Sequence, residues 1–194
     1  MSSDEEDVYF QQREQDQRAE LRHKMAMAAN ELEEKRSIAG SVATDDLEVA
    51  ARVKALGFDG DSARIFDLLP LVHVAWADGK IQRGERSAIL KIVEGRGIER
   101  GSEAFKTMES LLEEKPADSF MRESLSVLRE VTGGLGDRSA SIVDMCIKVA
   151  ASAGGFLGLK LGQKIGDDER KQIETIVASL GPDASSAFQK DLGQ

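Results

Sequence analysis

The sequence contains few of the residues that define several large classes of protein. Its single cysteine, Cys146, excludes an internal disulfide framework, and we expect its side chain in the core. With one Trp, one Tyr and three prolines in 194 residues, the composition favours helices over an aromatic-rich β-sandwich. No uncharged apolar run approaches the roughly 20 residues of a membrane-spanning helix, and residues 1–15 lack the positive and apolar regions of a signal peptide. We therefore expect a cytoplasmic protein with no membrane insertion.

Basic residues are fewer than acidic ones. The chain has 35 acidic and 26 basic residues, which gives a net charge of −9. A chain of this sign repels the phosphates of DNA and RNA and the surface of anionic membranes. The composition therefore excludes nucleic acid as an expected partner, whereas cations and basic protein patches are compatible with it.

The pattern along the chain is that of an all-α protein. No segment sustains the period-two alternation of a strand, and glycine or proline follows nearly every periodic segment, as in the short connections of a helical bundle. We expect an N-terminal helical arm at residues 1–40 and a helical domain at residues 41–194. Thr44 and Asp61 are predicted N-caps, and Pro70 is predicted to kink the helix that contains it.

An apolar stripe marks the N-terminal arm. Residues 4–36 are rich in good helix formers, and four apolar side chains recur at the spacing of one helix face: Leu21, Met25, Ala28 and Leu32. The stripe is too short to predict a coiled coil. We expect the helix to lean on its own domain or on a second chain, and we predict a protein partner or a homo-oligomer formed through it. Small residues around Gly40 are expected to end the arm.

The domain contains an internal repeat. Residues 80–93 align without a gap on residues 164–177, and Lys, Ile, Glu, Arg, Ile, Ile and Val coincide. The repeat units, about residues 61–96 and 138–180, predict two helix-turn-helix halves that share one core about a pseudo-two-fold axis. The second unit carries an apolar insertion at residues 154–162 that the pattern leaves open as helix or loop.

The segment HVAWADGKIQRGERSAILKIV, residues 73–93, predicts the end of one helix, a tight turn and the start of the next helix. A purely structural interpretation explains its residues well. Gly79 suits the left-handed position that closes a helix, and Asp78 can accept hydrogen bonds from nearby backbone N–H groups. Glu85 lies three residues after Gln82, from where its carboxylate reaches back to the N-cap backbone. The repeat places a second glutamate three residues after a glycine, at Glu169.

The alternative interpretation of this turn is a cation site. Asp78, Glu85 and turn carbonyls are hard oxygen ligands of the kind that calcium and magnesium prefer. The spacing is not that of an EF-hand, because Lys80 and Ile89 occupy places where that loop requires ligands. Any such site would therefore be weak and open, and the cap interpretation is the favoured one.

The same segment resembles the TerB-like (tellurite resistance) family. The residues that match the family pattern are Ala75, Ala77, Asp78, Gly79, Ile81 and Glu85. The resemblance covers about residues 45–180 and implies an all-α bundle of two pseudo-symmetric halves, with roles in stress response, metal association and scaffolding but no catalysis. It implies Asp78 and Glu85 as candidate metal ligands. The chain departs from the pattern at Gln82, and the second repeat lacks the aspartate.

A competing prediction is a metal-dependent enzyme. Glu20 and His23 form a Glu-x-x-His pair on one helix face, the pair that di-iron carboxylate proteins use, and a dimer would have to supply the remaining ligands. The only other histidine, His73, follows an apolar run and is predicted to be packed and hydrogen-bonded. Two histidines outside glycine-framed loops give no Ser-His-Asp or Cys-His arrangement. We therefore expect a non-catalytic binding module, with the di-iron enzyme as the alternative.

Overall fold

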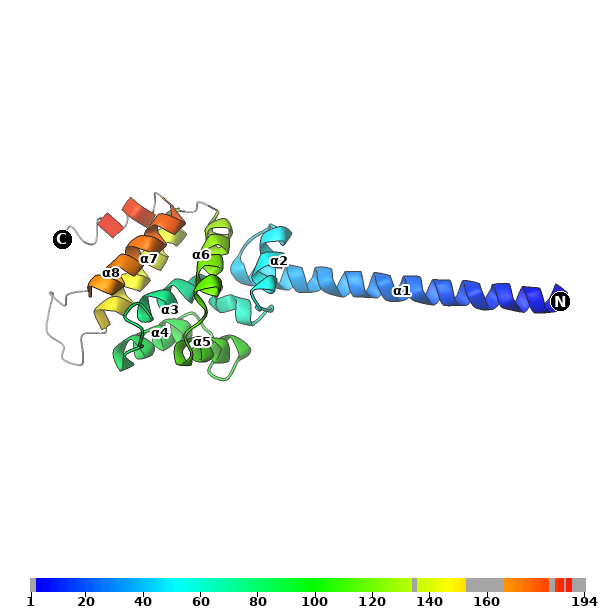
Figure 1. Ribbon diagram of the computed structural model, residues 1–194, viewed down its shortest axis with the longest axis horizontal. Helices are drawn as coiled ribbons and strands as arrows, with labels where there is room; N and C mark the ends of the chain where they lie inside the picture. The colour runs from blue at the N-terminus through cyan, green and yellow to red at the C-terminus, as the bar shows by residue number, and fades with distance from the viewer. Residues whose placement is uncertain (1–2, 134–135, 153–165, 182–183, 187, 190–194) are drawn as a thin grey trace.

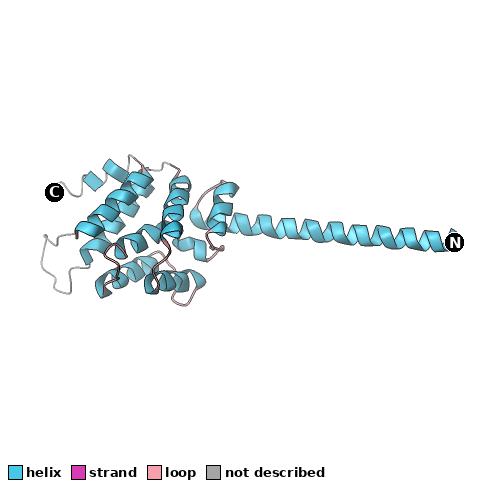
Figure 2. Ribbon diagram, viewed as in Figure 1, coloured by secondary structure: helices cyan, strands magenta, loops and turns pink. Residues whose placement is uncertain are grey.

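A computed structural model describes residues 3–133, 136–152, 166–181, 184–186 and 188–189. Among these residues the regular secondary structure is helical, with loops and turns between the helices and no strand (Figure 2). One long helix, α1, projects from a body in which the other helices pack together (Figure 1). The all-α prediction is thus confirmed for the described part of the chain. None of the described helices combines the length and the apolar character needed to cross a membrane.

The elements follow one another through short connections. In chain order they are α1 (Ser3–Val42), α2 (Leu47–Ala55), the 3-10 helix η1 (Ser62–Leu68), α3 (Leu69–Ala75), α4 (Arg83–Gly95), α5 (Glu103–Glu113), α6 (Asp118–Thr132), α7 (Gly136–Ser152) and α8 (Asp167–Leu180). The predicted insertion at residues 154–162 lies outside the described residues.

Helix α3 is the centre of the body. All seven of its residues are buried, and it packs against η1, α4, α6, α7 and α8. The surrounding helices are amphipathic and direct one apolar face toward it, which is the arrangement expected when several short helices share one core. Cys146 on α7 is fully buried, as predicted, and burial raises the pKa of its thiol far above the usual range. This thiol is therefore a packed core group.

Helix α1 ends within the small-residue segment around Gly40 that the sequence predicts, at Val42. Its last turns belong to the body, because Ile38, Ala39 and Val42 are buried where α1 packs against α2 and η1. The helix stops where Ala43 takes a left-handed backbone conformation with φ of 56°.

The two residues predicted as N-caps, Thr44 and Asp61, do not cap the helices that follow them. The next helix after α1 is capped by Asp46, whose Oδ1 accepts hydrogen bonds from the N–H groups of Glu48 and Val49 at 2.8 and 3.4 Å. Thr44 instead accepts a bond from the Asp46 N–H, so the predicted cap is two residues early. Asp61 does not cap its own helix either: its Oδ2 accepts from the Ala104 N–H at 3.0 Å and so tethers the start of α5.

Pro70 does not kink a continuous helix, contrary to the prediction. The chain forms the tight 3-10 helix η1 up to Leu68, and α3 begins at Leu69. Pro70 therefore lies in the first turn of α3, where a missing N–H costs nothing because that group would have no intrahelical partner.

Candidate functional site

The turn between α3 and α4 has the local geometry that the sequence predicts. Gly79 has a φ of +86°, and its N–H donates to the Trp76 carbonyl at 3.0 Å. Asp78 is exposed, and its Oδ1 accepts a hydrogen bond from the Lys80 N–H at 3.0 Å. Helix α3 itself ends at Ala75 with Trp76 as its C-cap, so the left-handed glycine and the aspartate shape the turn that follows the helix and do not close it. The geometry thus confirms that Asp78 shapes the turn.

Glu85 caps α4 from within its first turn. Its Oε2 accepts a hydrogen bond from the Gln82 N–H at 2.8 Å, and the side chain is only 2 % exposed. In α8, Glu169 does the same: its Oε2 accepts from the Gly166 N–H at 2.6 Å, and it is 8 % exposed. The predicted reach-back of both glutamates to the residue before the helix is confirmed.

Glu85 also carries the most unusual electrostatics of the turn. The pKa of its carboxyl is raised from 4.5 to about 7, mainly by burial and to a smaller extent by the negative charges of Glu169 and Asp78. The hydrogen bond from the Gln82 N–H acts in the opposite direction, because it stabilises the charged form. The two helix-capping glutamates and Asp78 are therefore close enough to interact, although residues 85 and 169 lie far apart in the sequence.

This clustering of carboxylates bears on the predicted cation site. A bound cation would relieve the mutual repulsion of Asp78, Glu85 and Glu169. Within the described part of the chain, no three or more His, Cys, Asp or Glu side chains are grouped so as to hold a metal ion. The calcium or magnesium site at Asp78 and Glu85 stays a prediction.

His73 in α3 and Trp76, the C-cap residue of that helix, are packing residues, as predicted for His73. The His73 side chain is 3 % exposed, and its Nε2 lies 3.3 Å from Ser124 Oγ. Because Ser124 donates its own hydroxyl hydrogen to the Met121 carbonyl at 2.9 Å, His73 Nε2 is the donor in this pair. Burial lowers the pKa of His73 to about 4, so the ring is neutral at pH 7. Trp76 Nε1 donates to the Leu111 carbonyl at 2.9 Å and fixes the indole beside α5.

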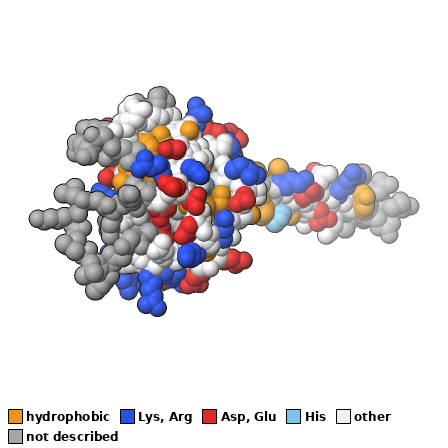
Figure 3. All heavy atoms as spheres, turned by 60° about the vertical axis from the view of Figure 1, so that its left-hand side comes forward, with side chains coloured by type: hydrophobic (Ala, Val, Ile, Leu, Met, Phe, Trp, Pro, Cys, Tyr) orange, Lys and Arg blue, Asp and Glu red, His pale blue; other side chains and the backbone are white. Residues whose placement is uncertain are grey.

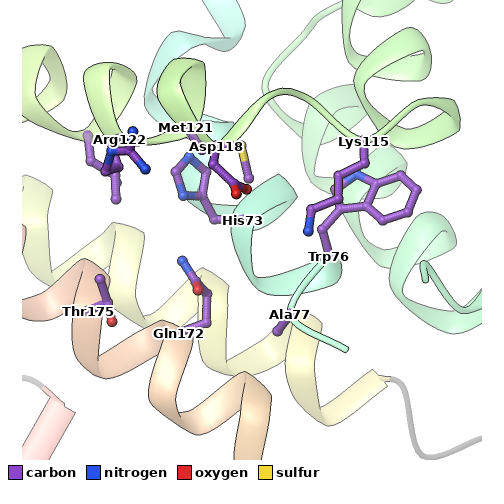
Figure 4. Close-up of a pocket in the computed structure, with 10 residues that line it drawn as sticks. His73, Trp76, Ala77, Lys115, Asp118, Met121, Arg122, Gln172 and Thr175 are labelled. Atoms are coloured by element: carbon purple, nitrogen blue, oxygen red, sulfur yellow. The ribbon is translucent and has the colours of Figure 1, made fainter. Parts of the chain in front are cut away.

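His73 and Trp76 line a cleft that the sequence analysis did not predict. It has a volume of about 270 Å³ and is bounded by the end of α3, the start of α6 and one face of α8 (Figure 4). The residues around it are His73, Trp76, Ala77, Lys115, Asp118, Met121, Arg122, Leu125, Gln172 and Thr175. The one local signal was the spacing of Lys115, Asp118 and Arg122, but that spacing alone does not reveal a hollow that residues of α3 and α8 complete.

The Glu-x-x-His pair lies on the projecting part of α1. Glu20 and His23 are both exposed, and Glu20 Oε1 pairs with Lys24 Nζ at 2.7 Å. Ion pairs four residues apart, such as Glu20–Lys24, are common on solvated helices and stabilise them slightly. The di-iron interpretation, which requires ligands from a second chain, stays a prediction.

Comparison of the chain with protein-family models, with curated protein sequences and with solved structures found no match.

Proposed function

We propose that this chain is a non-catalytic, TerB-like binding module whose helical body presents α1 for pairing with a second copy of the chain. The observation that carries the proposal is the apolar stripe of α1, which the body leaves in solvent. Leu21, Met25 and Leu32 are 59 %, 64 % and 37 % exposed. Figure 3 shows apolar side chains on α1 lying open among charged ones. Large apolar side chains grouped along one face of a solvated helix are typical of a surface that binds another helix.

The charges beside the stripe favour a second copy as the partner. If two α1 helices pair antiparallel, with the centre between Met25 and Ala28, Leu21 of each helix faces Leu32 of the other. In the same register Lys24 of each copy lies beside Glu31 of the other, which gives two favourable pairs. Among the described residues of the single chain, these two side chains pair four residues away on their own helix, Lys24 with Glu20 and Glu31 with Lys35.

The TerB-like part of the proposal is supported by how the repeat units are packed. Helices α4 and α8 begin at aligned positions of the repeat, and each is capped by a glutamate in its first turn. Helix α3 packs against α7, α4 packs against α7, and α8 packs against α3, as expected if a pseudo-two-fold axis exchanges the two units. In this proposal the turn at Asp78 and Glu85 is a cap to which calcium or magnesium would bind only weakly.

The mass of the protein in solution tests the proposal. Size-exclusion chromatography with light scattering should give a dimer for the wild type and a monomer for the triple variant Leu21→Ala, Met25→Ala, Leu32→Ala. Met27→Ala is the matched control, because Met27 is 58 % exposed on the same helix but lies outside the stripe. It should remain dimeric.

Charge reversal tests the register. Lys24→Glu should weaken the dimer by placing like charges opposite each other, and adding Glu31→Lys should restore it. A wild type that stays monomeric at every concentration, or a triple variant that still dimerises, would contradict the proposal.

A further inference from the structure

We propose that the cleft between α3, α6 and α8 is a binding site for a small organic anion, a carboxylate carried on a compact apolar body. This inference concerns a different surface from α1 and does not depend on the proposed pairing of two chains. The cleft joins a buried, partly apolar floor to an exposed rim with two cationic side chains (Figure 4).

The floor supplies shape and apolar contact. Leu125 is buried at 6 % exposure, and Met121 and Trp76, which also line the cleft, are half-buried. The indole N–H of Trp76 is already donated to Leu111 on α5, so Trp76 adds no side-chain hydrogen-bond donor to the cleft. A floor of this kind favours the hydrocarbon part of a ligand over water.

The rim supplies the positive charge. Lys115 precedes α6 and Arg122 lies in it, and both side chains are exposed. Among the described residues neither forms an ion pair, whereas the Arg residues at positions 52, 86, 96 and 100 each lie within salt-bridge distance of an acidic side chain. In a chain of net charge −9, two cationic side chains that line one cleft and form no ion pair with a described acidic residue are a suitable place for an anionic group.

The remaining polar groups set the charge and size of the ligand. Asp118 is the one acidic side chain among the residues described around the cleft, so the lining carries a net charge of +1. His73 adds no charge because it is neutral at pH 7 and donates its Nε2 hydrogen to Ser124. Gln172 and Thr175 add hydrogen-bonding groups from α8. A volume of about 270 Å³ and a single net positive charge suit a small monocarboxylate better than a nucleotide or another polyanion.

Trp76 makes the test direct, because it is the only tryptophan in the chain and lies in the wall of the cleft. We would titrate the full-length protein with phenylacetate, hexanoate and benzoate and follow the tryptophan emission. At least one carboxylate should give a saturable change, with a dissociation constant on the order of 1 mM, as expected for ligands of this size. The neutral isostere phenylacetamide and inorganic phosphate should bind more weakly, because each lacks one half of the recognised chemistry.

Variants at the rim identify the site. Arg122→Gln and Lys115→Gln should each raise the dissociation constant of the bound carboxylate by about fivefold, and the double variant should raise it further. Arg129→Gln is the matched control, since Arg129 is an exposed arginine on α6 that does not line the cleft. The Arg129→Gln variant should bind the carboxylate with the same dissociation constant as the wild type. Far-ultraviolet circular dichroism confirms that each variant is folded.

Three results would overturn the proposal. The first is the absence of a saturable response to all three carboxylates. The second is equal binding of phenylacetate and phenylacetamide, which would mean that the charge is not recognised. The third is binding that Arg122→Gln and Arg129→Gln weaken equally, which would indicate attraction by the surface in general.

Discussion

The buried carboxyl of Glu85 predicts a specific dependence of stability on pH. In the unfolded chain this group has a pKa of 4.5, and in the fold burial raises its pKa to about 7. Between these two values the unfolded chain has lost the proton while the folded chain keeps it, so the folded state binds more protons. The free energy of unfolding contributed by Glu85 is therefore fully present below pH 4.5, falls as the pH rises to about 7, and is constant above that.

The size of the effect follows from the same two values. The difference between the folded and unfolded pKa of Glu85 corresponds to a change of about 3 kcal/mol in the free energy of unfolding. This figure is an upper limit, because the carboxylate still accepts the Gln82 N–H and its surroundings can relax when it ionises. We expect a loss of about 1 to 3 kcal/mol between pH 4.5 and pH 8. Glu85→Gln removes the charge and keeps an oxygen that can accept the same bond, so this contribution to the pH dependence should disappear.

Urea denaturation at several pH values between 4.5 and 8.5 measures this. Glu85→Gln should be about as stable as the wild type at pH 4.5 and clearly more stable at pH 8. Glu169→Gln should move the decline of the wild-type curve to lower pH, because the charge of Glu169 helps to raise the pKa of Glu85. Glu174→Gln, an exposed position on α8, is the control and should leave the curve unchanged. Wild-type and Glu85→Gln curves that run parallel from pH 4.5 to 8.5 would refute the reasoning.

Three further predictions concern the turn, the arm and the thiol. Calcium or magnesium should leave the wild-type Tm unchanged, because Asp78 and Glu85 each already accept a backbone hydrogen bond. A saturable rise in Tm that is lost in the double variant Asp78→Asn, Glu85→Gln would instead establish the cation site; a cation at a hundred times its dissociation constant would add about 2.7 kcal/mol to the free energy of unfolding. Deleting residues 1–36 should leave a body with a cooperative thermal melt, since Ile38 and the other buried residues of α1 are retained; a non-cooperative melt would show that the arm is part of the core. Cys146 should react with a thiol reagent only in denaturant, and labelling of the native protein at the rate of a free thiol would contradict its burial.

The features that could be predicted from the sequence are those fixed by neighbours in the chain. The left-handed Gly79 and the reach-back of Glu85 and Glu169 each depend on residues within three positions, so their spacing was sufficient. The burial of His73 followed from the apolar run before it.

The features that the sequence analysis missed depend on distant parts of the chain. Asp61 looks like a local cap, but it bonds the N–H of Ala104, forty-three residues later. Pro70 was expected to kink a helix because nothing in the sequence shows that the preceding turn is a 3-10 helix. The cleft forms where α3, α6 and α8 pack together, and no single segment of the sequence predicts that these three helices are neighbours.

Helix α1 shows most clearly where the sequence pattern becomes ambiguous. The spacing of the stripe, continued from Leu32 through Lys35, reaches Ala39 and Val42, so one face of the helix runs from the exposed stripe into the body. A pattern of apolar residues predicts that one face of a helix is buried, but it does not predict which part of the chain, or which other chain, covers that face. The body covers Ala39 and Val42 and leaves Leu21 and Leu32 in solvent. One end of the apolar face of α1 is therefore buried within the chain, and the other end is exposed. That division, which the sequence could not supply, is the reason to expect a second helix on the stripe.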